Sequence, residues 1–429
     1  MKKKIAYVLP AVTIGGGPSV VFQHANRLIK RGYEVAIINL DTDLKSEANW
    51  FKCNFPIFNW DVSANDKCPV KNIDIAIATY FSTLEIVKNK IKAERKIYFV
   101  QSDERRFDLS AEEFVKCQKS YQADVEFMTE AKWIQRWLKE EFGKNVYYVP
   151  NGLDEKIFFP TAPLVPKTKK VRVLLEGPID VPFKGVADAY NAVKDLNCEL
   201  WIISSLGKPK RNWRYDRFFE RVPMEKMNEI YSSCDILLKM SKVEGFFGPP
   251  LEAMACGCVP VVAECTGFDE YIQNKKNALT VAIGDVKAAK NAVRELLNDS
   301  DLREKIRKTG IKTARQWSWE QSIDYLEKVI KKEPIKIFYN NENPRRYDFE
   351  KTMSFYQKDV IKNSLDRIQH LCFEKKQLES RNQTLQRQLD LMRHSRIQKL
   401  KEVFLKIKHW TIFLFLNPRK FIKKYLIRK

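Results

Sequence analysis

The sequence of 429 residues contains no run of about 20 apolar residues, the length that a helix needs to span a bilayer. We therefore expect no membrane-spanning segment. The nine cysteines lie at irregular spacings, and Cys256 and Cys258 are too close together for the usual zinc knuckle. We expect neither a metal site nor a disulfide framework from them, and a reducing cytoplasm fits this pattern.

Acidic residues are scarce relative to basic ones, with 54 Asp and Glu against 76 Lys and Arg and a net charge of +22. Residues 393–429 hold 12 Lys and Arg and one acid, Glu402, so they carry +11, half of the total. Such an asymmetry predicts an anionic surface as partner. No nucleic-acid-binding motif occurs, so we expect no nucleic acid.

The first residues, MKKKIAYVLPAVTIGGG, have the charged start and apolar run of a signal peptide. The apolar run is short, contains Pro10 and ends in Gly15, Gly16 and Gly17, so residues 4–9 are interpreted as a first strand. A helix from about 19 to 31 and a strand at 34–40 complete a predicted βαβ unit. Its turn is not G-x-G-x-x-G, which leaves a dinucleotide site without support.

Residues 241–264 hold two glutamates, Glu244 and Glu252, on either side of a Gly- and Pro-rich turn. The pattern predicts strand, loop, helix and strand, with a helix starting near Pro249 or Pro250 and ending at Gly257. A helix N-terminus at the tip of a parallel sheet suits an anion. Since carboxylates bind hydroxyls, the pair suits a ligand with phosphates and sugar hydroxyls; the alternative is two solvated glutamates beside an ordinary turn.

The segment EGFFGPPLEAMACGCVPVV, residues 244–262, resembles the signature of retaining glycosyltransferases of family 4, E-G-F-G-x-x-x-x-E-A-M-A-x-G-x-P-V-V. Phe247 stands where the signature has glycine, and the spacing of the two glutamates is kept. Two further segments resemble the same family. PNGLDEKIFFP, residues 150–160, is similar to its interdomain segment, and residues 317–331 are similar to its last helix, which packs back across the junction.

The resemblance implies an α/β protein with the GT-B fold, two Rossmann-like domains with an interdomain cleft between them. We expect an N-terminal acceptor domain at residues 1–160 and a nucleotide-sugar donor domain at 161–332. A polar linker at 333–350 follows, then a C-terminal helical or coiled-coil extension at 351–400 and a basic amphipathic tail at 401–429.

The resemblance also implies residue roles around the loop. Glu252 would bind the ribose hydroxyls of the donor, and Glu244 would hold hydroxyls of the donor sugar as one of two candidate catalytic residues. Phe246, Phe247 and Gly248 would offer backbone N–H groups to the donor.

Lys184, the other candidate catalytic residue, and Gly185 would bind the donor diphosphate. Family members usually have a second cation, an Arg after a Gly in this region, but here Gly177 is followed by Pro178. Arg172 lies inside the predicted strand and is a poor replacement. No Asp-x-Asp motif is needed, because Lys184 and the helix N-terminus would act in its place. We therefore expect no metal and no cofactor, the nucleotide sugar being a substrate.

On the acceptor side, the resemblance places the glycines at 15–17 at the cleft; the alternative is a tight strand-to-helix turn only. The stretch YFVQSDERRF, residues 98–107, is similar to rhamnosyltransferase-like members. It places Gln101, Asp103 and Glu104 at the carboxyl end of a strand, where open α/β sheets bind ligands. Gln101 stands where many members have His.

The resemblance implies transfer of a sugar from a nucleotide-sugar donor to a glycan or lipid-linked acceptor, with retention at the anomeric carbon, in bacterial surface polysaccharide synthesis. An alternative is a nucleotide-sugar-binding GT-B scaffold without catalysis, which the absent Arg favours. A sugar-nucleotide epimerase of the same fold is a third alternative, but such enzymes lack this loop.

Residues 353–400 contain no Gly or Pro, and Leu371, Leu378, Leu385 and Met392 recur every seven residues. This pattern predicts a coiled coil that joins copies of the chain into a homo-oligomer; the alternative is one helix lying on the protein's own surface. In residues 401–429 apolar side chains alternate with lysines, as in an in-plane membrane anchor; the alternative is a basic disordered tail. We expect a cytoplasmic protein, peripheral on the inner face of the cell membrane.

Overall fold

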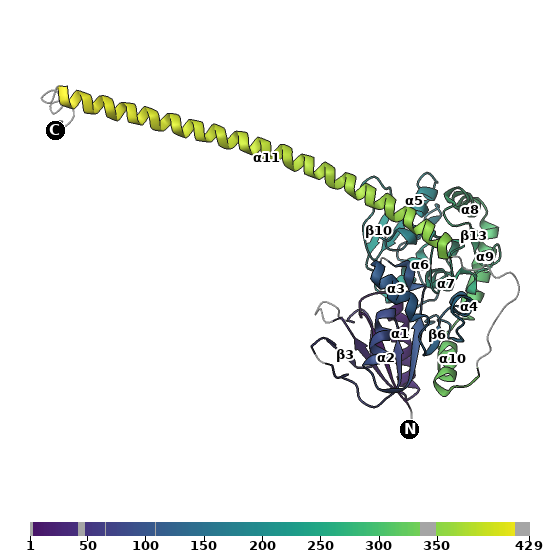
Figure 1. Cartoon of the computed structure of the whole chain (residues 1–429). Helices are drawn as coiled ribbons and strands as arrows, with labels where there is room; N and C mark the ends of the chain where they lie inside the picture. The colour runs from purple at the N-terminus through teal and green to yellow at the C-terminus, as the bar shows by residue number, and fades with distance from the viewer. Residues whose placement is uncertain (1–2, 42–47, 65, 108, 335–348, 417–429) are drawn as a thin grey trace. The chain divides into compact units, whose positions relative to one another are not determined.

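The computed structural model of the chain describes all residues except 1–2, 42–47, 65, 108, 335–348 and 417–429 (Figure 1). In the last helix it leaves the side chains of 349–372, 392–393, 395–396, 410 and 412–416 undescribed. The chain divides into two compact units, residues 1–359 and 360–429. The predicted linker at 333–350 lies almost entirely outside the described residues.

Seven parallel strands form the first sheet, in the order β3-β2-β1-β4-β5-β6-β7. Along β1, Ile5 and Tyr7 point into one apolar core, and Ala6 and Val8 point into the other. Both faces of the sheet are therefore covered, which is why its strands are apolar runs without alternation. Its elements are β1 (Lys4–Leu9), α1 (Gly16–Lys30), β2 (Glu34–Asn39), β3 (Ile57–Asn59), β4 (Ile73–Ala78), α2 (Phe81–Asn89), β5 (Ala93–Val100), η1 (Glu104–Arg106), α3 (Ala111–Ser120), β6 (Glu126–Thr129), α4 (Lys132–Phe142) and β7 (Val146–Tyr148).

Six parallel strands form the second sheet, in the order β10-β9-β8-β11-β12-β13. Two further apolar cores cover its faces. We call each sheet with its helices a lobe. The elements of the second lobe are β8 (Arg172–Glu176), η2 (Pro182–Lys184), α5 (Val186–Val193), β9 (Glu199–Ser204), β10 (Arg217–Glu220), α6 (Met224–Ser233), β11 (Ile236–Lys239), α7 (Gly248–Ala255), β12 (Val259–Ala263), η3 (Phe268–Glu270), β13 (Leu279–Val281), α8 (Val286–Asn298) and α9 (Ser300–Ala314).

The chain crosses between the lobes twice, and the two crossings lie against each other. The Leu153 N–H donates to the Trp317 carbonyl oxygen at 3.2 Å, and a Cβ atom on Gly152 would lie 2.2 Å from the Trp319 nitrogen. Only glycine allows this close approach. After the second crossing, α10 (Trp319–Lys331) packs on the core of the first lobe, in contact with α1 (Figure 1). The predicted boundary at residue 160 lies between β7 and β8.

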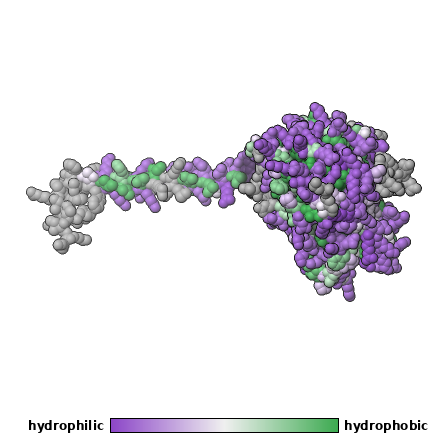
Figure 2. Space-filling view, turned by 90° about the horizontal axis from the view of Figure 1, so that it is seen from below, coloured by the Kyte–Doolittle hydropathy of each residue, from purple (hydrophilic) through white to green (hydrophobic). Residues whose placement is uncertain are grey.

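The C-terminal unit consists of most of α11 (Phe349–Leu416), which continues through residues predicted as a separate tail. Leu378 and Leu385 of the predicted seam are exposed, and Figure 2 shows apolar side chains along this helix. Leu371 and Met392 lie outside the described side chains, as do Trp410 and residues 412–416; residues 420–424 are not described at all. Pairing of this helix between copies stays a prediction. Among the described residues, no helix combines the length and apolar character needed to cross a membrane.

Candidate functional site

In each sheet the strand order changes direction at one place, between β1 and β4 in the first and between β8 and β11 in the second. Ligands of open α/β sheets bind at the carboxyl ends of the strands beside such a point. In the second lobe, the loop after β8 leads to Lys184 and the loop after β11 leads to Glu244. These two side chains, 60 residues apart in the sequence, therefore meet at one edge of the sheet.

Lys184 and Glu244 form an ion pair, with Lys184 Nζ donating to Glu244 Oε2 at 2.7 Å. The other carboxylate oxygen, Glu244 Oε1, is buried and has no hydrogen-bond partner. Burial acts to raise the pKa of Glu244, but the charges of Lys184 and Lys239 outweigh it and hold the pKa below its usual value. Glu244 is thus an ionised acceptor with one unused oxygen.

A second ion pair lies beside the first. Lys239 Nζ donates to Glu176 Oε2 at 2.5 Å, from the last residue of β11 to the last residue of β8. A Cβ atom on Gly177 would lie 3.6 Å from Lys239 Nζ, and 3.7 Å from Lys184 Cβ. The side chain of Lys239 is only 2% exposed. The side chains of both lysines therefore start or end beside Gly177, next to Pro178, which stands where the expected Arg is missing.

The sequence prediction did not include Lys239. The sequence does contain a signal for Lys239, because a lysine in the apolar strand Ile236–Lys239 is unusual. A buried charge needs a partner or a function. Arg172, by contrast, lies in β8 with its guanidinium held by the Ser233 carbonyl oxygen and by Glu199. Arg172 therefore has a structural role, which agrees with the expectation that it does not replace the missing Arg.

The loop between Glu244 and α7 differs from the expected array of free N–H groups. The Phe246 N–H donates to Glu130 Oε1 at 3.1 Å, and the Gly248 N–H donates to the Phe246 carbonyl oxygen at 2.9 Å. The next two residues are prolines, which have no N–H. Phe247 is fully buried. The start of α7 thus offers an anion its dipole more than its N–H donors.

Glu252 lies on α7, partly buried, and Tyr231 Oη donates to its Oε2 at 3.4 Å. Burial and the charge of Glu176 raise the pKa of Glu252 to about 7. A carboxyl group that titrates near neutrality beside a sheet edge is typical of functional sites.

Gly185 has a positive φ of +66°, and a Cβ atom on it would lie 2.0 Å from the Met240 carbonyl oxygen. The structure therefore gives this glycine a packing role, because it lets the turn that carries Lys184 lie against the segment after β11.

On the first lobe, Gly16 and Gly17 are the first residues of α1, and Gly15 precedes them in an extended conformation. A Cβ atom on Gly17 would lie 3.4 Å from the Gln101 side chain, and one on Gly245 would lie 2.2 Å from the Gln101 carbonyl oxygen. Gln101, the glycine turn and the loop of Glu244 are therefore brought together where the lobes meet.

Asp103 is placed differently from these residues. It is fully buried, and its carboxylate accepts two hydrogen bonds from the Arg105 guanidinium, at 2.9 and 2.8 Å, and one from the Arg105 N–H at 3.2 Å. Glu104 is also buried, accepting from Tyr98 Oη and the Phe81 N–H at 2.8 Å each, and burial raises its pKa to about 8. This geometry turns both carboxylates into the first lobe, so neither offers an oxygen to a ligand.

Two buried glutamates connect the lobes, and the sequence prediction included neither. Glu130, after β6, accepts from the Phe246 N–H and from Asn151 Nδ2 at 3.0 Å. Glu270 of the second lobe accepts from the Lys132 N–H and from Tyr148 Oη, the latter at 2.9 Å. Burial raises the pKa of each to about 7. A carboxylate at the end of an apolar strand was the available signal for Glu130.

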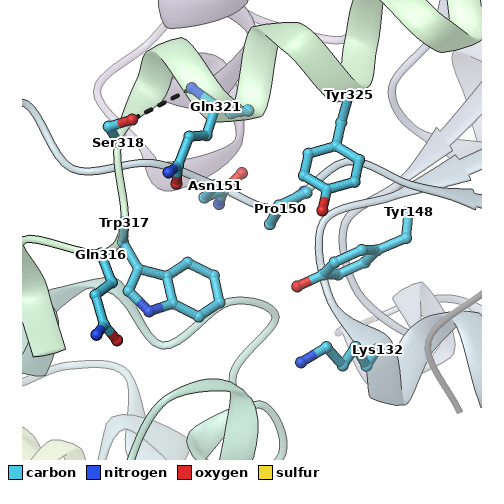
Figure 3. Close-up of a pocket in the computed structure, with 10 residues that line it drawn as sticks. Lys132, Tyr148, Pro150, Asn151, Gln316, Trp317, Ser318, Gln321 and Tyr325 are labelled. Carbon is cyan, nitrogen blue, oxygen red and sulfur yellow. Dashed lines mark hydrogen bonds between the residues drawn. The ribbon is translucent and has the colours of Figure 1, made fainter. Parts of the chain in front are cut away.

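At the two crossings lies a cavity of about 190 Å³, which we call the hinge cavity (Figure 3). Trp317 lies on one side, and Tyr148, Tyr325 and Lys132 lie on the other. Asn151 and Ser322 line its buried part, and the exposed Gln316 and Gln321 line its opening. Among the described residues, no group of three or more His, Cys, Asp or Glu side chains has the arrangement of a metal site.

Residues 216–313 match the family model of glycosyl transferases group 1. An uncharacterized glycosyltransferase of Methanocaldococcus jannaschii is 24% identical over 208 residues, which cover 46% of this chain and 57% of that protein. The N,N'-diacetylbacillosaminyl-diphospho-undecaprenol alpha-1,3-N-acetylgalactosaminyltransferase of Campylobacter jejuni is 32% identical over 110 residues, which cover 26% and 27%. The matches thus span about half of the first relative and about a quarter of the second.

Solved structures extend the likeness of fold to both lobes. Sucrose-phosphate synthase from Thermosynechococcus elongatus has a TM-score of 0.66 at 15% identity, covering 77% of this chain and 99% of that one. Anabaena HepE in complex with UDP-glucose has a TM-score of 0.62 at 13% identity, with coverage of 77% and 99%. These neighbours and the two parallel sheets show that the chain has the GT-B fold, and within it residues 216–313 match the glycosyl transferases group 1 family.

Proposed function

We propose that this protein transfers a sugar from a nucleotide-sugar donor to a glycan or lipid-linked acceptor, with retention at the anomeric carbon. One observation carries the proposal: two lysines, Lys184 and Lys239, each paired with a carboxylate, lie at the carboxyl ends of β8 and β11. The Campylobacter relative is named for an acceptor on diphospho-undecaprenol, and the Anabaena neighbour is in complex with UDP-glucose. The second name supports a nucleotide-sugar donor, and the first supports a lipid-linked acceptor.

In this proposal Lys184 and Lys239 bind the donor diphosphate, and Gly185 keeps Lys184 in place. The two lysines supply the two positive charges that a diphosphate clamp needs, of which the sequence alone had predicted only Lys184. Because fixed charges in a site shielded from water stabilise a developing phosphate charge, no metal ion is required. Glu252 accepts hydrogen bonds from the ribose hydroxyls, and the unused oxygen of Glu244 accepts one from a hydroxyl of the donor sugar.

The reaction breaks the bond between the anomeric carbon and the diphosphate oxygen and forms one to the acceptor oxygen. The acceptor hydroxyl loses its proton to the leaving diphosphate, so no protein nucleophile takes part. The acceptor lies toward Gln101 and the glycine turn at 15–17, on the first lobe. We assign no such contact to Asp103, given its pairing with Arg105.

Finer assignments complete the proposal. The donor sugar is rhamnose or a related hexose, from the likeness of residues 98–107, and the pathway makes a bacterial surface polysaccharide. Residues 401–429 hold the protein on the anionic inner face of the cell membrane, and residues 353–400 join copies of the chain.

The test measures thermal unfolding of the full chain with UDP, GDP, dTDP and ADP. A ligand that binds only the folded state stabilises it by RT ln(1 + [L]/Kd), about 2.7 kcal/mol at 100 Kd. At least one nucleoside diphosphate should raise Tm, and Glu252→Ala should remove the rise without lowering the Tm of the free protein. Stabilisation by none of them contradicts the proposal. A Tm rise without any transfer from the matching nucleotide sugars instead indicates the catalytically inactive scaffold.

A further inference from the structure

We propose that the hinge cavity is a second binding site, which takes one uncharged sugar residue. Neither lysine pair is among its lining residues, and none of those residues was assigned to the donor or the acceptor. The proposal does not depend on the transferase activity.

Two buried polar atoms of the cavity have no hydrogen-bond partner. Asn151 is 8% exposed, and its Oδ1 is unpartnered while its Nδ2 donates to Glu130. Ser322 is 1% exposed, and its Oγ is also unpartnered. Leaving a buried polar group unpaired costs about 1–3 kcal/mol, so such groups are normally satisfied by protein, water or ligand. Both therefore favour an occupant that donates hydrogen bonds.

The chemistry of the lining matches a polyol. Asn151, Gln316 and Gln321 carry amides, and Tyr148 and Tyr325 carry hydroxyls; all of these groups donate and accept, as sugar hydroxyls do. The indole of Trp317 offers a flat apolar face for the C–H side of a sugar ring, and Figure 3 shows it across from the two tyrosines.

The charge of the lining favours a neutral ligand. Lys132 is the one cation among the lining residues, and its Nζ lies 3.7 Å from Glu270 Oε2. Above pH 7 the Glu270 carboxyl is mostly ionised and offsets that charge. A phosphate or a sulfate would meet one paired cation here, against two lysines at the edge of the second sheet.

The size favours one ring. Pockets for drug-sized ligands measure about 300–1,000 Å³, whereas this cavity measures about 190 Å³. A nucleotide sugar is too large for it, but a single sugar residue, free or at the end of a glycan, is of the right order.

The cavity shares its walls with the donor loop. The ring of Trp317 lies 5.5 Å from that of Phe246, measured between centroids. Asn151 connects to the Phe246 N–H through Glu130. An occupant that bonds Asn151 and packs on Trp317 therefore contacts the hydrogen-bond partner of Glu130 and the ring that packs on Phe246. It should change the affinity for a nucleoside diphosphate, and the diphosphate should change the affinity for the occupant by the same factor.

The test is saturation-transfer NMR on the full chain at pH 8, with methyl α-glycosides of glucose, mannose, rhamnose and N-acetylglucosamine as probes. At least one glycoside should receive saturation, and the signal should persist in excess UDP, GDP and dTDP. The variants Gln321→Trp and Gln316→Trp fill the opening from exposed positions, and each should abolish the signal. Lys331→Trp, which lies on α10 as Gln321 does but outside the lining, is the matched control and should retain the signal.

Two results overturn the proposal. One is the absence of saturation for every glycoside, in which case the cavity holds water only. The other is a signal that survives in both tryptophan variants, which would place the glycoside at the acceptor side of the cleft. The readout needs no nucleotide, so failure of the transferase proposal would not produce either result.

Discussion

Lys239 shows how a single side chain decides what the site can bind. A buried ammonium group is unfavourable without a partner, and the Glu176 carboxylate supplies one at 2.5 Å. Although burial lowers the pKa of Lys239, the charges of Glu176 and Glu244 raise it above its usual value, so the side chain stays charged. A diphosphate that displaces Glu176 would therefore meet an ammonium group already in place.

The first prediction concerns the two lysines. Lys184→Ala should weaken binding of nucleoside diphosphates by about tenfold or more, because a charge-assisted hydrogen bond contributes roughly 1.5–3 kcal/mol. The double variant Lys239→Met/Glu176→Gln should do the same, and it avoids leaving a buried carboxylate unpaired. Isothermal titration with a diphosphate and with its nucleoside measures the effect, which should be confined to the diphosphate.

Glu176→Gln alone is the matched control, since it keeps Lys239. Its diphosphate affinity should equal or exceed that of the wild type. If the double variant binds like the wild type, Lys239 is a structural residue and the assignment of the second charge fails.

The second prediction concerns the pH dependence of ribose binding. The pKa of Glu252 is raised to about 7. Between about pH 4.5 and 7 this carboxyl group therefore binds a proton more readily in the folded protein than in the unfolded chain. The ionised carboxylate is the stronger acceptor and offers both oxygens to the two hydroxyls, whereas protonation turns one oxygen into an O–H donor. Affinity for a nucleoside, which has no phosphate to titrate, should therefore rise between pH 6 and 8 and then level off.

Glu252→Gln should bind the nucleoside with an affinity that does not change over the same range, as titration calorimetry at four pH values would show. A wild-type affinity that is flat from pH 6 to 8 would contradict the role of Glu252 at the ribose.

At the scale of elements, the turn that carries Lys184 depends on Gly185. Its φ is +66°, nearly the same as the +67° of Gly143 at the end of α4, but only Gly185 lies against another segment. A Cβ atom would meet the Met240 carbonyl oxygen at 2.0 Å, whereas one on Gly143 would meet nothing within 4 Å.

The third prediction compares alanine at these two positions. Gly143→Ala should lower the free energy of unfolding by about 1–2 kcal/mol, the cost of left-handed backbone. Gly185→Ala should lower it by about 1–3 kcal/mol more, because it also overpacks the contact, and it should weaken diphosphate binding by moving Lys184. Urea unfolding measures the free energy of unfolding of both variants. Equal losses in the two would show that the turn at Gly185 can move away from Met240, and would contradict its packing role.

The strands were predictable because parallel strands covered on both faces appear as apolar runs, as β1 and β12 do. The ends of the helices were less predictable than the strands. For example, α1 begins at Gly16 instead of about residue 19, because Gly15 takes the extended conformation that precedes a helix. The short, largely exposed β3 gave no such signal. In the site, the pairing of Lys184 with Glu244 depends on strand order, which no local pattern reveals.

The whole molecule adds a C-terminal unit to the two lobes, and its composition points to a surface. Described side chains of α11 such as Phe404 and Leu405 are 75% and 65% exposed, on a helix whose neighbouring residues are largely basic. Exposed apolar side chains with interleaved lysines are typical of helices that lie in a membrane interface.

The fourth prediction is that deleting residues 401–429 releases the protein from anionic membranes. Flotation with phosphatidylserine liposomes should recover the full chain and not the truncated one, and salt should weaken the recovery only in part, since screening affects the lysines and not the apolar side chains. Activity on a short soluble acceptor should be nearly unchanged. Equal flotation of both forms, or none of either, would exclude the anchor.

The central claim is that the paired lysines and glutamates of the second lobe bind and activate a nucleotide sugar. The most direct measurement is release of nucleoside diphosphate from a panel of UDP-, GDP- and dTDP-sugars, to water or to simple glycoside acceptors, by the full chain. We expect release from at least one donor, with loss of about 100-fold or more in kcat/KM for Lys184→Ala and Glu252→Ala, corresponding to about 2.7 kcal/mol. Release that is unchanged in both variants, or none from any donor together with no diphosphate binding, would contradict it.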